Sequence, residues 1–150
     1  MREDYRLARL YMAQSLSQDA RMELPRELAH YLTTVLRKRE GDAVRLFNGE
    51  DGEWRALISE AVKKSVTLTI ETQLRTPAAM PDVWLLFAPV KKARTEFILE
   101  KATELGAVHI QPVITARTQH PRLRMDRVRA QIIEAAEQTE RLDIPQSFEP

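Results

Sequence analysis

The sequence lacks several residue types on which large classes of chemistry depend. It has no cysteine, which excludes disulfide bonds and thiolate chemistry. Its three histidines, His30, His109 and His120, do not have the spacing of metal ligands, and no metal site is expected. The four glycines are scattered and form neither a dinucleotide-binding loop nor a Walker-type phosphate loop. A small-molecule-binding α/β protein that relies on a phosphate loop is therefore disfavoured.

Long apolar segments are also missing. No apolar run approaches the roughly 18 residues of a membrane span. The first twelve residues, MREDYRLARLYM, carry acids and lack the apolar core of a signal peptide. These features predict a cytoplasmic protein with no membrane contact.

The charges that are present almost cancel. The 150 residues include 23 basic and 22 acidic side chains, for a net charge of +1, which argues against indiscriminate nucleic-acid binding. The basic residues gather locally, however, at residues 37–39, at Lys63 and Lys64, at Lys91 and Lys92, and above all in RTQHPRLRMDRVR at 117–129. Each short cluster alone is typical of a solvated face. The density of arginine in 117–129 leaves two interpretations open, a solvated face or a contact with phosphate groups.

Hydrophobic patterning predicts two domains. The first 75 residues alternate in the manner of short strands around one helix, which indicates a small β-rich barrel or sandwich. Residues 76–82, TPAAMPD, have the composition of a linker. The expected strands are 9–12, 21–24, 43–48, 53–61 and 66–72, and the expected helix is 26–38, followed by Gly41 and Asp42 as its end signal.

Residues 83–150 change to the pattern of an α/β domain. The apolar run 83–90 predicts a strand buried on both faces, followed by a helix over 91–105, a strand over 108–115 and a helix over 124–141. On the last helix the expected apolar stripe is Met125, Val128, Ile132, Ala135, Ala136 and Thr139. Glu137 and Arg141 are expected on the opposite side, where an i,i+4 ion pair in solvent is the default interpretation.

The helix over 91–105 carries one charge in an unexpected place. A spacing of about 100° per residue puts Phe97, Ile98, Ala102 and Leu105 on one face, with Lys101 among them. Glu96, Glu100 and Thr103 are expected to point away. Lys101 must extend its stem over the apolar surface, pair with an acid or face a functional site, and the pattern leaves these alternatives open.

Several short segments, taken in order, resemble one family. They are Arg9-Leu10-Tyr11, His30 with Val35-Leu36-Arg37, Gly41-Asp42, Phe47-Asn48-Gly49, Lys63-Lys64, Glu96 with Lys101 and Glu104-Leu105-Gly106, Pro112, Arg117, and Glu134-Ala135-Ala136-Glu137-Gln138 with Arg141 and Pro145. Their order across nearly the whole chain is similar to that of the RsmE-type small-subunit ribosomal RNA methyltransferases, which methylate N3 of a uridine with S-adenosylmethionine.

The resemblance implies a fold, a cofactor and partners. The fold is a PUA-like β-barrel over 1–75 followed by an α/β SPOUT domain that begins at residue 83. The implied cofactor is S-adenosylmethionine, the implied substrate is 16S ribosomal RNA in the small ribosomal subunit, and the full-length protein is expected to be a homodimer.

The resemblance also implies roles for individual residues. Those with a catalytic role are Arg117, Arg141 and Lys101; those that contact RNA are Arg9, His30, Arg37, Lys63, Lys64, Lys92, Arg122 and Arg124; and those that brace the cleft are Glu104, Glu137 and Gln138. For His30, a buried structural histidine is the alternative, because the other face of its helix is apolar.

One departure from the family is large. The family builds its methyl-donor pocket from a Gly-Pro-Glu-Gly-Gly loop and an arginine-containing turn, and neither occurs before the chain stops at IPQSFEP. We therefore expect the cofactor pocket to lie beyond residue 150, the α/β domain to be incomplete with apolar surface exposed, and this chain alone to be inactive. A shortened homologue without catalysis is the alternative, as is a non-catalytic RNA-binding adaptor that uses the barrel and the arginine-rich loop.

Overall fold

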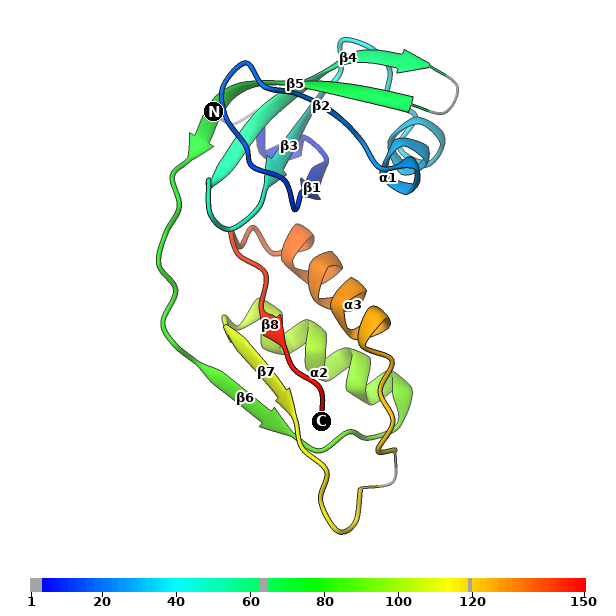
Figure 1. The fold of residues 1–150 in the computed structure, drawn as a ribbon, viewed down its shortest axis with the longest axis vertical. Coiled ribbons are helices and arrows are strands. Elements are labelled where there is room, and N and C mark those ends of the chain that lie inside the picture. The colour runs from blue at the N-terminus through cyan, green and yellow to red at the C-terminus, as the bar shows by residue number, and fades with distance from the viewer. Residues whose placement is uncertain (1–3, 63–64, 119) are drawn as a thin grey trace. The chain divides into compact units, whose positions relative to one another are not determined.

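The chain divides into two compact units, Met1–Pro77 and Ala78–Pro150. The computed structural model describes residues 4–62, 65–118 and 120–150. Strands dominate the first unit, whereas the second combines strands with two longer helices (Figure 1). The division falls inside the segment 76–82 that was predicted as a linker. Lys63 and Lys64, both predicted to bind RNA, lie outside the described residues.

A five-stranded sheet forms the first unit. Its order is β1-β3-β4-β5-β2, with β1 parallel to β3 and the other neighbours antiparallel. A β1–β2 ladder that would close the sheet is not among the described strand pairs, so the closed barrel stays a prediction. The strands are β1 (Arg9–Tyr11), β2 (Arg21–Glu23), β3 (Ala43–Phe47), β4 (Glu53–Val62) and β5 (Ser65–Arg75), preceded by the short 3-10 turn η1 (Asp4–Arg6).

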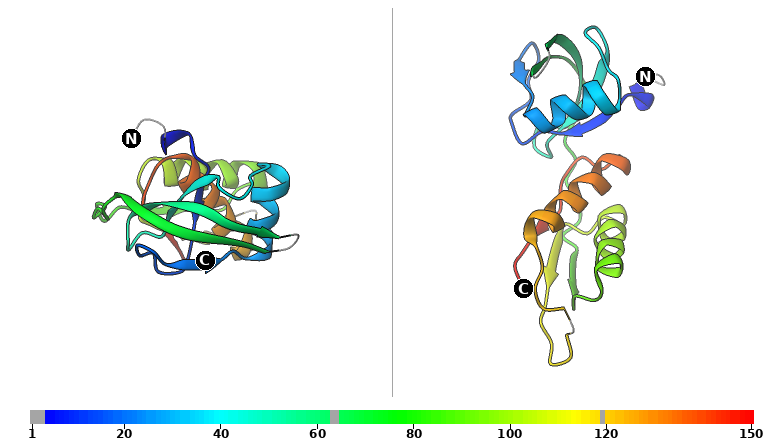
Figure 2. Two further views of the ribbon diagram at one scale, coloured as in Figure 1. Left: turned by 90° about the horizontal axis from the view of Figure 1, so that it is seen from above. Right: turned by 90° about the vertical axis from the view of Figure 1, so that its right-hand side faces the viewer.

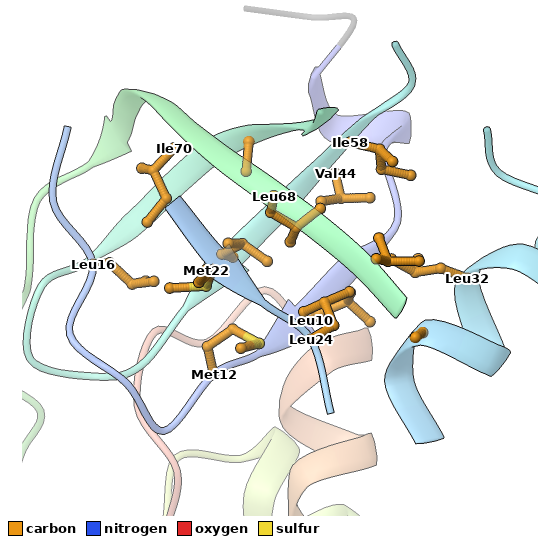
Figure 3. Packing of buried hydrophobic residues seen from close by; sticks show 14 residues of the cluster. Leu10, Met12, Leu16, Met22, Leu24, Leu32, Val44, Ile58, Leu68 and Ile70 are labelled. Carbon is orange, nitrogen blue, oxygen red and sulfur yellow. The ribbon is translucent and has the colours of Figure 1, made fainter. Parts of the chain in front are cut away.

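The core of this unit follows the alternation in its sequence. In β5 every second residue from Val66 to Ile70 is buried, as the pattern VTLTIET predicts. These side chains meet Leu10 of β1 and Leu32 of the helical segment (Figure 3). The strands at the two ends of this unit's sequence therefore share one hydrophobic core.

The predicted helix over 26–38 is shorter and less regular than expected. It consists of α1 (Arg26–His30) followed by a π-helical turn, η2 (Tyr31–Val35). Arg37 then takes a left-handed conformation with φ of 54°, and the amide of Lys38 donates to the carbonyl oxygen of Leu32 at 2.8 Å. The predicted stop at Gly41 and Asp42 was wrong, because this backbone closure ends the helix before them.

The second unit is a three-stranded parallel sheet with two helices. The strand order is β6-β7-β8, and the helices α2 and α3 pack side by side (Figure 2). The core combines Phe87 and Ile110 of the sheet with Leu99, Val128 and Ile132 of the helices. The elements are β6 (Trp84–Phe87), α2 (Lys92–Glu104), β7 (His109–Pro112), α3 (Met125–Gln138) and β8 (Gln146–Ser147). The sequence did not predict β8, since two residues carry no periodic signal.

Strand β6 is not buried on both faces, contrary to the prediction. Trp84 and Leu86 are 48% and 60% exposed, whereas Phe87 is buried. The reason is that the core side chains of α2 and α3 gather on the face that carries Phe87. On the other face Trp84 stacks on the ring of His109, with 4.1 Å between ring centroids, and on Phe148 at 5.3 Å. The exposed apolar surface that was expected is therefore present.

The buried face of helix α2 is only partly the one predicted: Ile98 and Ala102 pack against the core as expected, but they are only partly buried. Thr95, Leu99 and Thr103 are buried, whereas Phe97 and Leu105 are 59% and 86% exposed. The threonine hydroxyls can be buried because backbone carbonyls accept their hydrogen bonds, from Thr95 to Val90 at 3.0 Å and from Thr103 to Leu99 at 2.8 Å.

The end of α2 agrees with the sequence, whereas α3 ends at Gln138, before the predicted end at 141. Gly106, with φ of 93°, ends α2 as predicted. In α3 the predicted stripe is confirmed for its central residues, since Val128, Ile132, Ala135 and Ala136 are all buried.

Among the described residues, no helix has both the length and the apolar character needed to cross a membrane.

Candidate nucleic-acid interface

The residues of the second unit that were predicted to bind RNA follow the carboxyl ends of its strands, at one edge of the sheet. Because the strands are parallel, the carboxyl ends of β6 and β7 lie at the same edge, where ligands of α/β sheets usually bind. Lys92 follows β6, and Arg117, Arg122 and Arg124 follow β7 in a loop that extends past the strand ends (Figure 2). The same edge holds the N-termini of α2 and α3, whose dipoles favour anions.

A pocket of about 230 Å³ lies between the first turns of these two helices. Its apolar lining comes from Val90, Leu99, Leu123 and Val128. Its charged lining is mostly cationic. The charged and titratable residues around it are Lys92, Glu96, His120, Arg122, Arg124 and Arg127.

Four lysine and arginine side chains line the pocket, of which two are paired with a carboxylate and two are not. Lys92 lies 3.8 Å from Glu96, and Arg124 lies 2.5 Å from Asp126. The hydrogen bond with Arg124 lowers the pKa of Asp126, and the same bond raises the pKa of Arg124. Within the described part of the chain, Arg122 and Arg127 have no carboxylate partner. The pocket therefore carries an excess of positive charge.

The structure brings together Lys92, Arg122 and Arg124, as predicted, and adds Arg127. Arg127 was not among the residues predicted from the sequence. A usable signal was present, because Arg127 follows Arg124 by three residues at the start of a helix and so lies near it on the surface. Arg117 is exposed in the same loop but does not line the pocket.

Lys101 pairs with acidic side chains, which is one of the alternatives that the sequence left open. Its Nζ atom lies 2.8 Å from carboxylate oxygens of both Glu100 and Glu104, and 5.7 Å from the centroid of the Phe97 ring. The hydrogen bonds that Lys101 donates to these two carboxylates raise the pKa of Lys101, and the same bond to Glu100 lowers the pKa of Glu100. Glu104 therefore braces Lys101 on the surface of α2.

Arg141 is buried, which corrects the expectation that it lies on a solvated face. Its Nη1 atom donates to the carbonyl oxygens of Thr103 and Ala107 at 2.7 and 2.9 Å, and its Nε and Nη2 atoms bind the carboxylate of Asp143 at 2.9 and 2.7 Å. A cation at carbonyl groups around the end of α2 also complements the helix dipole. This geometry favours a positioning role for Arg141 over the predicted catalytic one.

The three residues predicted as catalytic do not form one cluster. Arg117 lies at the carboxyl edge of the sheet, whereas Lys101 and Arg141 lie at the far end of α2, a helix about 20 Å long by its residue count. Glu137 is half-buried and Gln138 is exposed in the last turn of α3, also away from the pocket. Of the predicted catalytic residues, Arg117 alone belongs to the loop that also carries the pocket residues Arg122 and Arg124.

Arg9, predicted to contact RNA, is buried in the first unit. Its Nε atom lies 2.5 Å from Glu53, and its guanidinium stacks on Phe47 with 3.7 Å to the ring centroid. Arg45 and Arg75 also approach Glu53, at 3.5 and 3.7 Å. Because Arg9 is buried among these ion pairs, we assign it a structural role in place of the predicted contact with RNA. The ion pairs around Glu53 join β1, β3, β4 and β5.

His30 and Arg37 are both exposed, as contact with RNA requires. The alternative of a buried His30 was wrong. The Nδ1 atom of His30 lies 3.1 Å from the hydroxyl of Thr34, and the two residues line a groove of about 560 Å³ between the helical segment and the β4–β5 hairpin.

The cationic pocket does not fit S-adenosylmethionine. Its sulfonium would meet like charge at Lys92, Arg122 and Arg127 in the pocket. The second unit has one glycine, Gly106, and so cannot form a glycine-rich cradle. Over the described ranges, no group of three His, Cys, Asp or Glu side chains is arranged to hold a metal ion either.

Comparisons with known families agree with the division into two units. A model described as an RNA methyltransferase domain matches residues 76–150, and a model described as an RNA methyltransferase PUA domain matches residues 24–71.

Two curated relatives are each called ribosomal RNA small subunit methyltransferase E. The relative from Rickettsia conorii is 35% identical over 138 residues, which are 91% of this chain and 57% of that protein. The relative from Synechocystis is 32% identical over 139 residues, which are 91% of this chain and 46% of that protein. The chain thus spans about half the length of these relatives.

Solved structures of methyltransferases also resemble this chain. A ribosomal RNA small subunit methyltransferase E from Neisseria gonorrhoeae, bound to S-adenosyl methionine, superposes with a TM-score of 0.83 at 28% identity, over 95% of this chain and 61% of that one. A Legionella pneumophila protein in complex with the bound cofactor SAM also gives 0.83, at 29% identity, over 97% of this chain and 63% of that one.

Proposed function

The chain belongs to the RsmE-type family of RNA methyltransferases, and we propose that it contributes the RNA-binding part of an enzyme that methylates small-subunit ribosomal RNA. The observation that supports this proposal most directly is the cationic pocket near the carboxyl ends of β6 and β7. RNA presents phosphate groups to such a surface. The target that we propose is N3 of a uridine in 16S ribosomal RNA, and the methyl donor is S-adenosylmethionine.

The relatives support the donor, since two similar solved proteins hold S-adenosylmethionine. The cationic pocket of this chain does not fit that molecule, and we assign its residues no contact with it. Their proposed task is to hold RNA. The proposal also places the reaction in the cytoplasm, in the small ribosomal subunit, with a homodimer as the working form.

The chemistry of the target explains why a cation is needed near the base. N3 of uridine carries a proton whose pKa lies well above neutrality, so methyl transfer requires its removal or stabilisation of the anion that results. Arg117 is exposed at the proposed RNA surface and could face the carbonyl oxygens of the base, where that negative charge develops. In the proposal Arg117 stabilises the anion, while Arg141 and Lys101 maintain the end of α2.

The test is nucleoside mass spectrometry of small-subunit ribosomal RNA from cells with and without this gene. Loss of 3-methyluridine on deletion, and its return when the gene is restored, is the expected result. An unchanged level of 3-methyluridine would contradict the enzyme proposal.

The alternative is a non-catalytic RNA-binding adaptor, which the cationic pocket and the exposed His30 and Arg37 also permit. Both functions predict RNA affinity that falls steeply with salt, because phosphate contacts release counterions. Methylation distinguishes the two. An adaptor would bind the RNA and leave the 3-methyluridine level unchanged.

A further inference from the structure

We infer that the pocket between the first turns of α2 and α3 accepts a single RNA nucleotide, with its base on the apolar lining and its phosphate on the cationic rim. This inference rests on the proposed function, which supplies RNA as the ligand. It adds that the pocket binds one unstacked RNA base, whereas a simple basic surface would contact phosphate groups alone. Sequence-tolerant recognition of single-stranded RNA commonly uses such unstacked bases.

The lining of the pocket has two chemically different parts. Leu99 and Val128 are buried, and Val90 and Leu123 extend the apolar surface toward the opening. An apolar surface suits the faces of a base, which lose water when they are covered. Phosphate alone would gain nothing from these side chains. The apolar lining is therefore the observation that points beyond a plain anion site.

The rim supplies the charge that a phosphate needs. Arg122 and Arg127 have no carboxylate partner in the described ranges, and guanidinium groups bind phosphate oxygens through paired hydrogen bonds. The N-termini of α2 and α3 meet at the same place, and both are long enough to add a favourable dipole. Arg124 and Lys92 already have acidic partners and contribute less net charge.

The size of the pocket fits one nucleotide better than a larger ligand. Its volume of about 230 Å³ lies below the roughly 300–1,000 Å³ of pockets that enclose drug-sized molecules. The positive rim also disfavours the sulfonium of the methyl donor. Among the ligands of an RNA methyltransferase, a nucleotide of the substrate matches both the size and the charge.

The experiment is a nuclear magnetic resonance titration of the 150-residue chain with uridine 5′-monophosphate, uridine and inorganic phosphate. We expect the nucleotide to shift the amide signals around Leu123 and to bind about tenfold more tightly than either component, because it occupies both parts of the pocket. Equal affinity for the nucleotide and for phosphate would overturn the inference and leave a plain anion site.

Three variants assign the binding to the pocket. Arg127→Gln should weaken nucleotide binding about tenfold, because it removes a charge-assisted hydrogen bond. Arg129→Gln is the matched control: it makes the same charge change on the exposed surface of α3, outside the pocket, and should change affinity by less than about twofold. Val90→Ser should weaken binding of the nucleotide but not of phosphate. Equal effects of Arg127→Gln and Arg129→Gln would contradict the inference.

A further titration separates RNA from a free nucleotide. The trinucleotide UpUpU, whose middle nucleotide carries phosphodiesters on both sides, should bind at least as well as the monophosphate if RNA is the ligand. Failure of UpUpU to bind would indicate a site for free nucleotides and would overturn the assignment to RNA. These outcomes are independent of the deletion test, so loss of 3-methyluridine on deletion can uphold the proposed function even where the pocket binds no nucleotide.

Discussion

Arg141 Nη1 donates a hydrogen bond of 2.7 Å to the carbonyl oxygen of Thr103, which lies 38 residues earlier in the chain. This contact fixes the end of α2 to the segment between α3 and β8. Thr103 is fully buried and Arg141 is 8% exposed, so water cannot readily replace either partner.

Replacement of Arg141 by alanine should destabilise the second unit by about 3 kcal/mol, because it leaves Asp143 and two carbonyl groups without their cation. Hydrogen exchange of peptides from α2, followed by mass spectrometry, should show faster exchange at its carboxyl end. Arg129→Ala, on an exposed site of α3, should change stability by less than about 0.5 kcal/mol. Similar exchange in both variants would contradict the positioning role of Arg141.

Replacement of Glu53 by glutamine should destabilise the first unit by about 3–5 kcal/mol, since Arg9 and Arg45 are buried around this carboxylate. Urea unfolding measured by circular dichroism would report the loss. Glu60→Gln provides a control in the same strand, where the side chain is exposed. If the two variants were equally stable, the buried ion pairs would make no net contribution.

Gly52→Ala should destabilise the first unit more than Gly41→Ala does. Both glycines have positive φ, 81° and 87°, so each alanine meets a similar backbone penalty of about 1 kcal/mol. A Cβ atom at Gly52 would also lie 2.2 Å from the carbonyl oxygen of Arg75, whereas at Gly41 it would meet nothing within 4 Å. The difference between the melting temperatures of the two variants measures the cost of the steric clash. Equal melting temperatures would show that the end of β5 moves away from the added Cβ atom without loss of stability.

The first unit should lose stability in acid through Asp51. Its carboxylate accepts hydrogen bonds from the backbone amide of Leu16 and from the side chain of Asn48, and these bonds lower its pKa below the ordinary 3.8. A lowered pKa in the folded state means that the stabilisation is present above pH 3.8 and is lost as the pH falls through the folded value. Asp51→Asn should make stability less dependent on pH in that range. An unchanged pH profile in the variant would contradict this assignment.

Arg117→Ala in the intact gene should lower 3-methyluridine in small-subunit ribosomal RNA by roughly tenfold or more, while RNA affinity falls only slightly, if Arg117 stabilises the anion of the base. Arg117→Lys should restore part of the modification because it keeps the charge. Mass spectrometry of the RNA and filter binding of the purified protein give the two numbers. Equal losses of methylation and binding would assign Arg117 to docking alone.

The elements that depend on local pattern could be predicted from the sequence. The alternation in 66–72 specified β5, Gly106 specified the end of α2, and the apolar stripe of α3 identified its buried face. The ordered short motifs also indicated the RNA methyltransferase family. These features are encoded by neighbours in the chain, which is why periodicity and turn chemistry reveal them.

Contacts between side chains that lie far apart in sequence depend on the fold, and the sequence did not predict them. Periodicity placed Phe97 in the core and Thr103 in solvent, but the opposite holds, because the hydroxyl of Thr103 is satisfied by its own helix. The burial of Arg9 and Arg141 depends on acceptors 44 and 38 residues away, which no local pattern specifies. The cationic pocket likewise requires the parallel strands that bring the first turns of α2 and α3 to one edge of the sheet.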